Sequence, residues 1–535
     1  MRIIRKKFLV ILTLCSCQIA LSAPNCQKWD EKFNARRQLL IGEITLQVNN
    51  VFDLEKPVES QLIHKITNKL HIKTKKQVIQ RQLLFKEGDV FRKSLLAESE
   101  RLIRANAYIK DAEVKVTEVC GNKVNLSVKT TDTWTFAPGA SYGRSGGDNK
   151  SGFEVQEHNL LGYGKSLALF YDKNADRNSA GIEYQDKQLL GSKKELTIKA
   201  SSNSDGHDNK LLLAQPFYSF ESKNSWAIEL QDKRLEDPFY ANAEEVDKFD
   251  VASQQAYVSY GWSKPGSNEV KVSRFQVGWH YSKDKAISLN NRSNSELITE
   301  SYPWFAYESL ERQYIKLQNL RRMGVIEDTY IGKRYSLNLG YLSPVFGSDD
   351  DYLRIAGHFS DGLYKNNKHI ALVSADAVSY IGNGNRKGVQ LDLKAEYFYV
   401  KDPKNTLYLS GKFQMSDNFK IYEQYLSGSA DGMRGYPTGF QSGNKTAIVS
   451  AEYRHFFDYY PYRLAKFGAV AFADVGTAWG TSESQKIIKD VGIGLRIVPT
   501  RSSTLKVIHL DLAFPLDGND KTDSMQFNIT TKNTF

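Results

Sequence analysis

A glycine-rich stretch, Gly428-Ser-Ala-Asp-Gly-Met-Arg434-Gly435-Tyr436-Pro437, carries one arginine and one large aromatic residue. Further along the chain comes Phe472-Ala-Asp474-Val-Gly476, inside a segment that alternates like a strand. Because successive side chains of a strand point to opposite faces, Phe472 and Asp474 point the same way. An arginine on a loop reaches that aspartate only where the loop folds back against the strand. Arginine suits a two-pronged bond to a carboxylate, so the two stretches predict a loop held against a strand wall.

The chain from Trp134 to Phe535 consists of short alternating segments separated by Gly, Asn, Asp and Lys. The clearest are Gly152–Glu157, Ser166–Tyr171, Glu195–Ser201, Arg274–Tyr281, Tyr335–Leu342, Leu391–Tyr399, Leu407–Phe413, Thr446–Arg454, Phe467–Val475, Val491–Val498 and Gln526–Phe535. One apolar face and one polar face is the pattern of a transmembrane β-barrel, with lipid outside and a polar lumen inside. The same alternation suits a β-sandwich or a large soluble barrel, so the pattern alone leaves that alternative open.

The 535 residues include 29 tyrosines and 27 phenylalanines, and the mean hydropathy is −0.47. After the first residues, no run reaches the ~18–20 apolar residues that a membrane helix needs, so any membrane crossing is by strands. The formal charge of +11 is spread over segments of mixed sign. No basic stripe with interleaved aromatic residues occurs, which argues against a nucleic-acid partner.

Residues 1–22 read as a secretory signal peptide, with a basic start, the apolar run Phe8–Leu14 and small residues before Ser22. Cleavage is expected after Ser22, and lipidation at Cys17 is the alternative. Two cysteines then remain, Cys26 and Cys120. In an oxidising compartment they are expected to form a disulfide, with two unrelated thiols as the alternative.

A polar tail, residues 23–43, precedes a small α+β domain predicted over residues 44–132. Its expected elements, in order, are a strand Ile44–Val48, an amphipathic segment Gln61–Leu70, a helix Lys75–Phe85 capped by Thr74, a helix Ser94–Ala105, and a hairpin of Lys110–Thr117 and Lys123–Thr130. The hairpin turns at Gly121-Asn122, a strong turn signal.

Two short stretches match enzyme motifs, but both lack a feature that the chemistry requires. Gly139-Ala-Ser141-Tyr-Gly143 matches a nucleophile pattern, but that chemistry needs a strand-to-helix turn, and here the segment continues as a strand. An esterase that uses Ser141 is therefore the least favoured alternative. Gly164-Lys-Ser166 lacks the first glycine of a phosphate-binding loop, and the nine histidines are scattered. We predict no catalytic, cofactor or metal site.

The arginine loop and the Phe-x-Asp-x-Gly strand resemble paired motifs of the BamA/TamA superfamily, outer-membrane barrels with periplasmic POTRA (polypeptide-transport-associated) domains. The N-terminal stretches Asn68–Thr74, Leu83–Asp89, Glu98–Arg104 and Asp132-Thr-Trp134-Thr look like that domain. Asn159–Gly164 and Gln215–Ser219 look like early barrel strands, and a terminal Phe535 resembles the closing-strand assembly signal. Only one such domain fits here, as in a surface-antigen type of relative.

The resemblance implies sixteen barrel strands over residues 133–535, and we expect Asp237–Ala256 and Leu289–Tyr302 among the longer outside loops. Arg434 is expected to anchor the loop on Asp474, with Tyr436 and Phe472 as packing contacts. Gly435 and Gly476 would allow close backbone approach.

These features predict a Gram-negative outer-membrane factor that translocates or inserts other polypeptides. Its POTRA domain would capture extended clients by strand addition in the periplasm, and a seam between the first and last strands would pass them on. Expected partners are client proteins, outer-membrane lipid, and periplasmic chaperones or lipoproteins. The alternative function is a passive pore or a surface-binding barrel, with the POTRA domain as a periplasmic handle.

Overall fold

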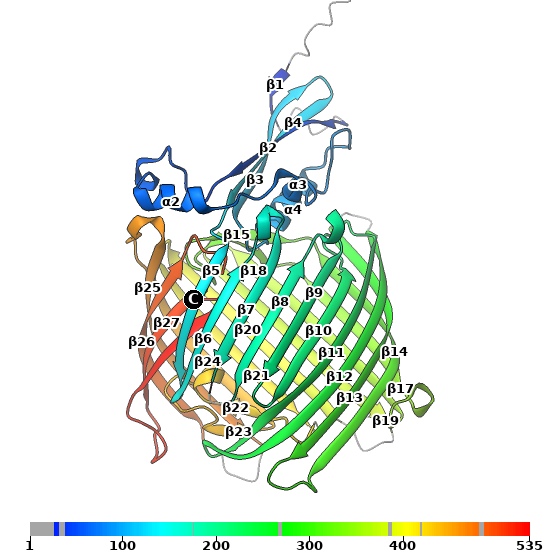
Figure 1. Cartoon of the computed structure of the whole chain (residues 1–535), viewed down its shortest axis with the longest axis vertical. Helices are drawn as coiled ribbons and strands as arrows, with labels where there is room; N and C mark the ends of the chain where they lie inside the picture. Colours follow the sequence, from blue (N-terminus) through cyan, green and yellow to red (C-terminus); the bar gives the residue numbers. More distant parts are fainter. Residues whose placement is uncertain are drawn as a thin grey trace, which may run out of the picture.

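The structure is a computed structural model. It describes residues 26–30, 38–174, 176–265, 270–382, 388–417, 420–480, 486–504 and 506–535. A small α+β domain sits at one end of a closed β-barrel (Figure 1). The expected signal peptide and Cys17 lie outside the described residues, as do residues 23–25 and 31–37 of the tail 23–43.

The barrel closes with twenty antiparallel strands among the described residues, so the expectation of sixteen is wrong. Its strands are β5 (Phe136–Ser145), β6 (Asp148–Glu157), β7 (Lys165–Lys173), β8 (Asn178–Asp186), β9 (Glu195–Asn203), β10 (Gly206–Gln215), β11 (Asn224–Ala241), β12 (Glu244–Pro265), β13 (Lys271–Ser288), β14 (Ser295–Glu311), β17 (Arg334–Leu342), β18 (Tyr352–Lys365), β19 (His369–Gly382), β20 (Gly388–Asp402), β21 (Asn405–Ser416), β24 (Lys445–Phe456), β25 (Ala465–Trp479), β26 (Ile488–Pro499), β27 (Val507–Pro515) and β28 (Gln526–Lys532). Sixteen was taken from the resemblance. In the described part of this chain, twenty strands each pair through the backbone with a neighbour on both sides, and that pairing sets the number in the wall.

The two expected outside loops are mostly strand. Asp237–Ala256 is the far part of the β11–β12 hairpin, which turns at Asn242 and Ala243, and β14 already begins at Ser295. They were expected to be loops in a barrel of sixteen strands. A strand that extends beyond the lipid layer stays paired through its backbone, however, so its side chains are free to be polar.

Side chains alternate across the barrel wall. Val277 and Trp279 of β13 are exposed on the outside, whereas on β25 the residues at even positions from Gly468 to Ala478 are buried inside. Large apolar residues are exposed on the outer face of most strands, including Phe153, Leu169, Ile182, Ile198, Leu230, Val258, Leu337 and Ile493. This is the outward apolar face of a barrel that lies in lipid.

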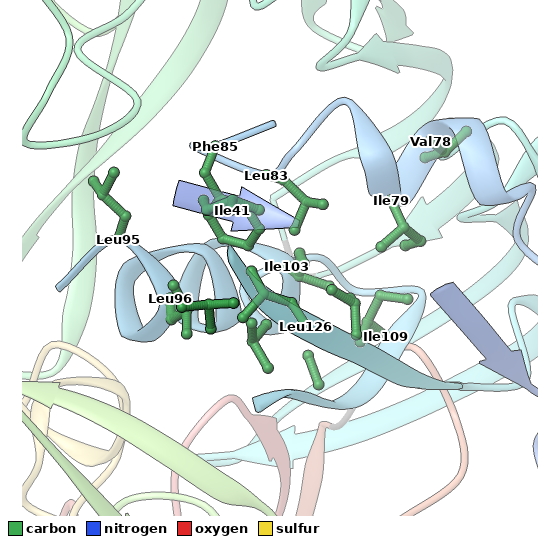
Figure 2. Close-up of a cluster of buried hydrophobic side chains, with 14 of the residues drawn as sticks. Ile41, Val78, Ile79, Leu83, Phe85, Leu95, Leu96, Ile103, Ile109 and Leu126 are labelled. Carbon is green, nitrogen blue, oxygen red and sulfur yellow. The ribbon is translucent and has the colours of Figure 1, made fainter. Parts of the chain in front are cut away.

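The small domain is a four-stranded sheet with two helices packed on it and a third helix set apart, next to the barrel rim. Its elements are β1 (Cys26–Lys28), β2 (Leu40–Asn49), α2 (Leu62–Leu70), α3 (Lys76–Gln80), α4 (Lys93–Arg104), β3 (Ile109–Cys120) and β4 (Lys123–Asp132). The strand order is β1-β3-β4-β2, with β2 parallel to β4 and β3 antiparallel to β4. Figure 2 shows Ile41, Phe85, Leu96, Ile103 and Leu126 gathered between the sheet and α4.

The helix expected over Lys75–Phe85 is shorter than predicted. It ends at Gln80, and Leu83 and Phe85 reach the core from the turn that follows. Thr74 does not cap it. The Thr74 N–H donates to Asp132 (2.7 Å) and its hydroxyl accepts a bond from Asn159 (2.9 Å), so this residue joins the small domain to the barrel instead.

Two short hairpins and six single-turn helices complete the described structure. They are β15 (Tyr314–Gln318) with β16 (Ile326–Tyr330), β22 (Tyr425–Ser427) with β23 (Gln441–Gly443), and the 3-10 turns η1 (Pro57–Glu59), η2 (Leu160–Gly162), η3 (Leu189–Gly191), η4 (Pro344–Phe346), η5 (Ser429–Asp431) and η6 (Pro461–Arg463). Among the described helices, none has the length and apolar character needed to span a membrane.

Candidate functional site

The segment between β21 and β24 folds back into the barrel from the end opposite the small domain, where Figure 1 shows β22 and β23 inside the wall. We call this segment, described from residue 420 to 444, the lumen loop. Met433 and Tyr436 at its centre are fully buried and pack against Ile448 and Ile488 of the wall. The loop is therefore part of the barrel interior.

Arg434 is held on three sides. Its Nε and Nη2 donate to the two carboxylate oxygens of Asp474, at 2.7 and 2.8 Å, and its Nη1 donates to Glu452 at 2.8 Å. The guanidinium carbon also lies 3.6 Å from the centre of the Phe472 ring. Arg434 is 8% exposed and Asp474 is fully buried, so water does not compete for these bonds. The structure thus brings together the arginine and the aspartate that the sequence paired.

Both glycines of the two motifs lie where a side chain would not fit. A Cβ at Gly435 would lie 2.6 Å from Cβ of Asp490, and one at Gly476 would lie 2.8 Å from the Met433 sulfur. The Tyr436 hydroxyl donates to the Lys489 carbonyl at 2.8 Å. The lumen loop therefore lies in close contact with the wall along β25 and β26.

The sequence did not single out two further residues of this site. Glu452 of β24 accepts bonds from both Arg434 and Arg454, the latter at 2.8 Å. Asn528 of β28 donates through Nδ2 to the Arg434 carbonyl at 2.8 Å, and its Oδ1 accepts from Ser429 at 3.0 Å. Both residues are lumen-facing positions of predicted strands. A polar residue there is ordinary, so no sequence signal distinguished them.

In the described part of the barrel, the joint between the first and last strands has the fewest residue pairs. Among the described residues, β28 and β5 share one residue pair, Ile529 with Arg144, whereas β5 pairs with β6 along its full length. Ser429 of the lumen loop bridges this joint, because its hydroxyl lies 2.8 Å from the Ser145 hydroxyl of β5 and also binds Asn528 of β28. We call this joint the seam.

A cavity of about 660 Å³ opens beside the seam. It is lined by residues from both of its strands and from the lumen loop, among them Gly143, Lys150, Ser429, Thr530 and Lys532. An unpaired strand edge beside an open space can bond to another extended chain.

The chain end turns inward at the seam. The expected strand Gln526–Phe535 ends at Lys532, and the Phe535 N–H donates to the Arg321 carbonyl at 2.6 Å. Its ring is buried, with its centre 5.0 Å from that of Phe456. Because this last backbone group bonds to another segment, it leaves the strand ladder.

Residues 312–333 join β14 to β17 and contain β15 and β16. We call them the mouth hairpin, since they cross the barrel opening on the small-domain side. At the tip, Leu320 packs against Ile370 and Phe398, and Met323 lies in the same buried cluster as Phe535. The hairpin therefore reaches from β14 to the opposite wall.

The mouth hairpin is also bonded to the small domain. Arg104 of α4 donates from Nε and Nη2 to the two oxygens of Asp328, at 2.8 and 3.0 Å. Lys316 pairs with Glu100 of the same helix. A cavity of about 850 Å³ remains between α4, the hairpin and the chain end.

The other residues considered from the sequence lie away from this centre. Cys26 and Cys120 form a disulfide that ties β1 to β3. Ser141 lies in β5, which leads into the strand β6 rather than a helix.

Comparison with known proteins places these features in a family. Residues 159–535 match the Omp85 superfamily domain. Similar solved structures include BamA from Haemophilus ducreyi lacking POTRA domains 1–3, at 14% identity and a TM-score of 0.39, covering 92% of this chain and 85% of that one. CdiB from Acinetobacter baumannii is similar at 12% identity and a TM-score of 0.44, covering 92% of this chain and 74% of that one.

CdiB from Escherichia coli is similar at 11% identity and a TM-score of 0.42, covering 92% of this chain and 76% of that one. A search of curated proteins gave no match. The family domain spans well over half of the sequence and includes the lumen loop, both motifs and the closing strand. The chain therefore belongs to the Omp85 superfamily of outer-membrane β-barrel proteins.

Proposed function

We propose that this protein inserts other polypeptides into the outer membrane or passes them across it. The observation that carries the proposal is the seam, where β28 and β5 share one residue pair beside a cavity. An extended chain in lipid must have its backbone N–H and C=O groups bonded. A seam that opens would offer such groups on both of its edges.

In this proposal the small domain is a periplasmic POTRA domain that receives clients. Support comes from the order of its elements, in which β2 is followed by the helices α2, α3 and α4 and then by the β3–β4 hairpin, with β2 parallel to β4. β2 is an edge strand of the sheet in the described residues, and an edge strand accepts an extended peptide by strand addition.

The lumen loop would set the state of the seam. Arg434 fixes it to β24 and β25, and Ser429 connects it to both seam strands. A shift of the loop would therefore alter the contacts on both sides of the joint. We propose this as the role of the loop in client transfer, with Arg434 as the positioning residue.

The mouth hairpin bears on the alternative of a passive pore. It crosses the opening on the small-domain side and is bonded to both the wall and α4. A barrel that only conducts solutes has no need of a hairpin bonded to a client-receiving domain. We propose that the hairpin moves when a client engages that domain.

Site-specific photocrosslinking in living cells tests the function. A photoreactive residue is placed at Gln47 of the β2 edge, at Ser201 beside the lumen cavity, and at the outward-facing Ile198 as a control. Capture of the same extended polypeptides from Gln47 and Ser201, and not from Ile198, supports the proposal. Solute conductance without any captured polypeptide, and without loss of any outer-membrane or exported protein on deletion, favours the passive pore.

A further inference from the structure

The helix α2 leaves an apolar face uncovered. Leu62, Ile63, Ile66 and Leu70 lie within one arc of the helix and are all exposed, Leu62 at 73% and Leu70 at 66%. Removing apolar surface from water is energetically favourable. Exposed clusters of large apolar side chains therefore mark interaction sites.

The opposite face of α2 is fixed to the protein. The His64 ring is fully buried, and its Nε2–H donates to the Tyr462 carbonyl at 2.8 Å. Asn68 binds both the N–H and the carbonyl of Phe52, at 3.0 and 2.8 Å. Next to it, Glu59 is paired with Arg501 of the β26–β27 turn. The orientation of the helix is therefore set by polar contacts, and its apolar face is left free among the described residues.

This helix is docked on the rim of the lipid-facing wall. Its partner Tyr462 belongs to the β24–β25 turn, where Phe457, Tyr459 and Tyr462 are all exposed. Figure 1 shows α2 next to the end of β25, at the outer edge of the barrel. Exposed aromatic residues at a barrel rim lie at the boundary between hydrocarbon and headgroups. The uncovered apolar face thus adjoins the surface that already contacts lipid.

The charge of this segment is complementary to lipid phosphates. Residues 60–76 contain five lysines and no acidic residue. Lys65 and Lys69 lie along one edge of the apolar arc, next to Leu62, and both are exposed. Within the described part of the chain, neither takes part in a salt bridge. Lysines that border the apolar face of a short helix are typical of helices that lie in a membrane interface.

We infer that α2 binds the membrane surface, with its apolar face in the headgroup layer and Lys65 and Lys69 on the phosphates of anionic phospholipids. This contact would hold the small domain at a fixed height beside the seam strands. A protein partner with an acidic, apolar surface is the competing class of ligand. The position on the lipid-contacting rim favours lipid. The inference concerns lipid contact and does not depend on what the barrel transports.

Fluorescence of the full chain in vesicles tests this inference. Ile66→Cys carries an environment-sensitive dye, and Thr117→Cys, exposed on β3 away from the barrel, is the matched control. In vesicles with anionic phospholipid, the dye at position 66 is expected to shift to the blue, to resist aqueous iodide and to be quenched by lipids labelled near the headgroup. The dye at position 117 is expected to do none of these.

Charge reversal separates lipid from protein as the ligand. Each lysine at an anionic surface contributes about fivefold in binding, so Lys65→Glu with Lys69→Glu should expose the dye to iodide, whereas Lys123→Glu with Lys129→Glu should not. Unchanged barrel migration in unheated gels shows that each variant is folded. Equal iodide access at positions 66 and 117 in every vesicle would overturn the inference. So would shielding that requires a second protein or a second copy rather than anionic lipid.

Discussion

The Asn528 side-chain amide donates a 2.8 Å hydrogen bond to the backbone carbonyl of Arg434. Asn528 belongs to the closing strand, and the Arg434 guanidinium is bound by Glu452 and Asp474 on β24 and β25. One loop residue therefore connects the last strand to the wall several strands away. The seam and the arginine site are two ends of one hydrogen-bonded unit.

Replacing Arg434 should impair client transfer while the barrel still forms. Arg434→Ala leaves the buried Asp474 without a cation and leaves Glu452 with Arg454 alone, and removing one partner of a buried ion pair costs about 3–5 kcal/mol. We expect a lower unfolding temperature of the isolated protein and reduced client export from cells that carry the variant. Arg434→Lys keeps the charge but loses the two-pronged geometry, so it should be intermediate. Normal export by Arg434→Ala would show that the arginine does not position the loop for transfer.

Exchanging the charges should recover part of that activity. Arg434→Asp with Asp474→Arg restores the pair with the charges reversed. Glu452 then faces an aspartate at position 434 and loses its bond to that residue. Adding Glu452→Gln removes this repulsion, so the triple variant should exceed the double variant in export. Equal export by the triple and double variants would show that the contact between residues 434 and 452 does not matter for transfer.

Locking the seam should stop transfer reversibly. Cysteines at Arg144 and Ile529, the one residue pair across the joint, are expected to form a disulfide that blocks client export until a reductant is added. The matched control is Val155→Cys with Leu169→Cys, a neighbouring pair between β6 and β7 that stays closed in any case. Export that continues with a fully oxidised seam would exclude seam opening from the mechanism.

Releasing the mouth hairpin from α4 should open the barrel entrance. Asp328→Asn with Lys316→Gln removes the charge pairs to Arg104 and Glu100, so we expect higher ion conductance in planar bilayers. Lys333→Gln, whose weaker pair with Asp361 lies at the base of the hairpin, is the control. Conductance equal to that of the parent in both variants would show that the pairs to α4 do not keep the hairpin in place.

The small domain should become more stable against unfolding in mild alkali. Burial, together with nearby Arg501, lowers the pKa of Lys110 to about 8. An unfolded lysine titrates near about 10.4, so between these values the unfolded state binds more protons and stability rises with pH. The urea midpoint should therefore rise from about pH 7 to about pH 9.5 relative to Lys110→Met, which has no charge to lose. If the urea midpoints of the parent and of Lys110→Met change equally with pH, the effect comes from other titrating groups.

Local sequence pattern determined a large part of this protein. Alternation with period two indicated the strands of the wall and the side of β25 on which Phe472 and Asp474 lie, because neighbouring side chains of a strand must point to opposite faces. The same alternation indicated the β3–β4 hairpin, and apolar residues at helical spacing indicated α2 and α4. These are consequences of geometry over a few residues, so they can be predicted without knowing what each element packs against.

Only the tertiary structure decided the number of strands and the partners within the site. Asp237–Ala256 has a mostly polar outer face, and its apolar residues Phe239, Phe249 and Val251 face inward, so it carries no clear lipid-facing signal. It still continues a paired hairpin, because backbone bonds do not depend on side chains. Likewise, nothing local indicates that Glu452 shares Arg434 with Asp474, that Asn528 holds the loop to the closing strand, or that Phe535 leaves the ladder for Arg321. Those contacts join residues far apart in the chain, and they exist only because the barrel closes around a loop and a hairpin that enter it from opposite ends.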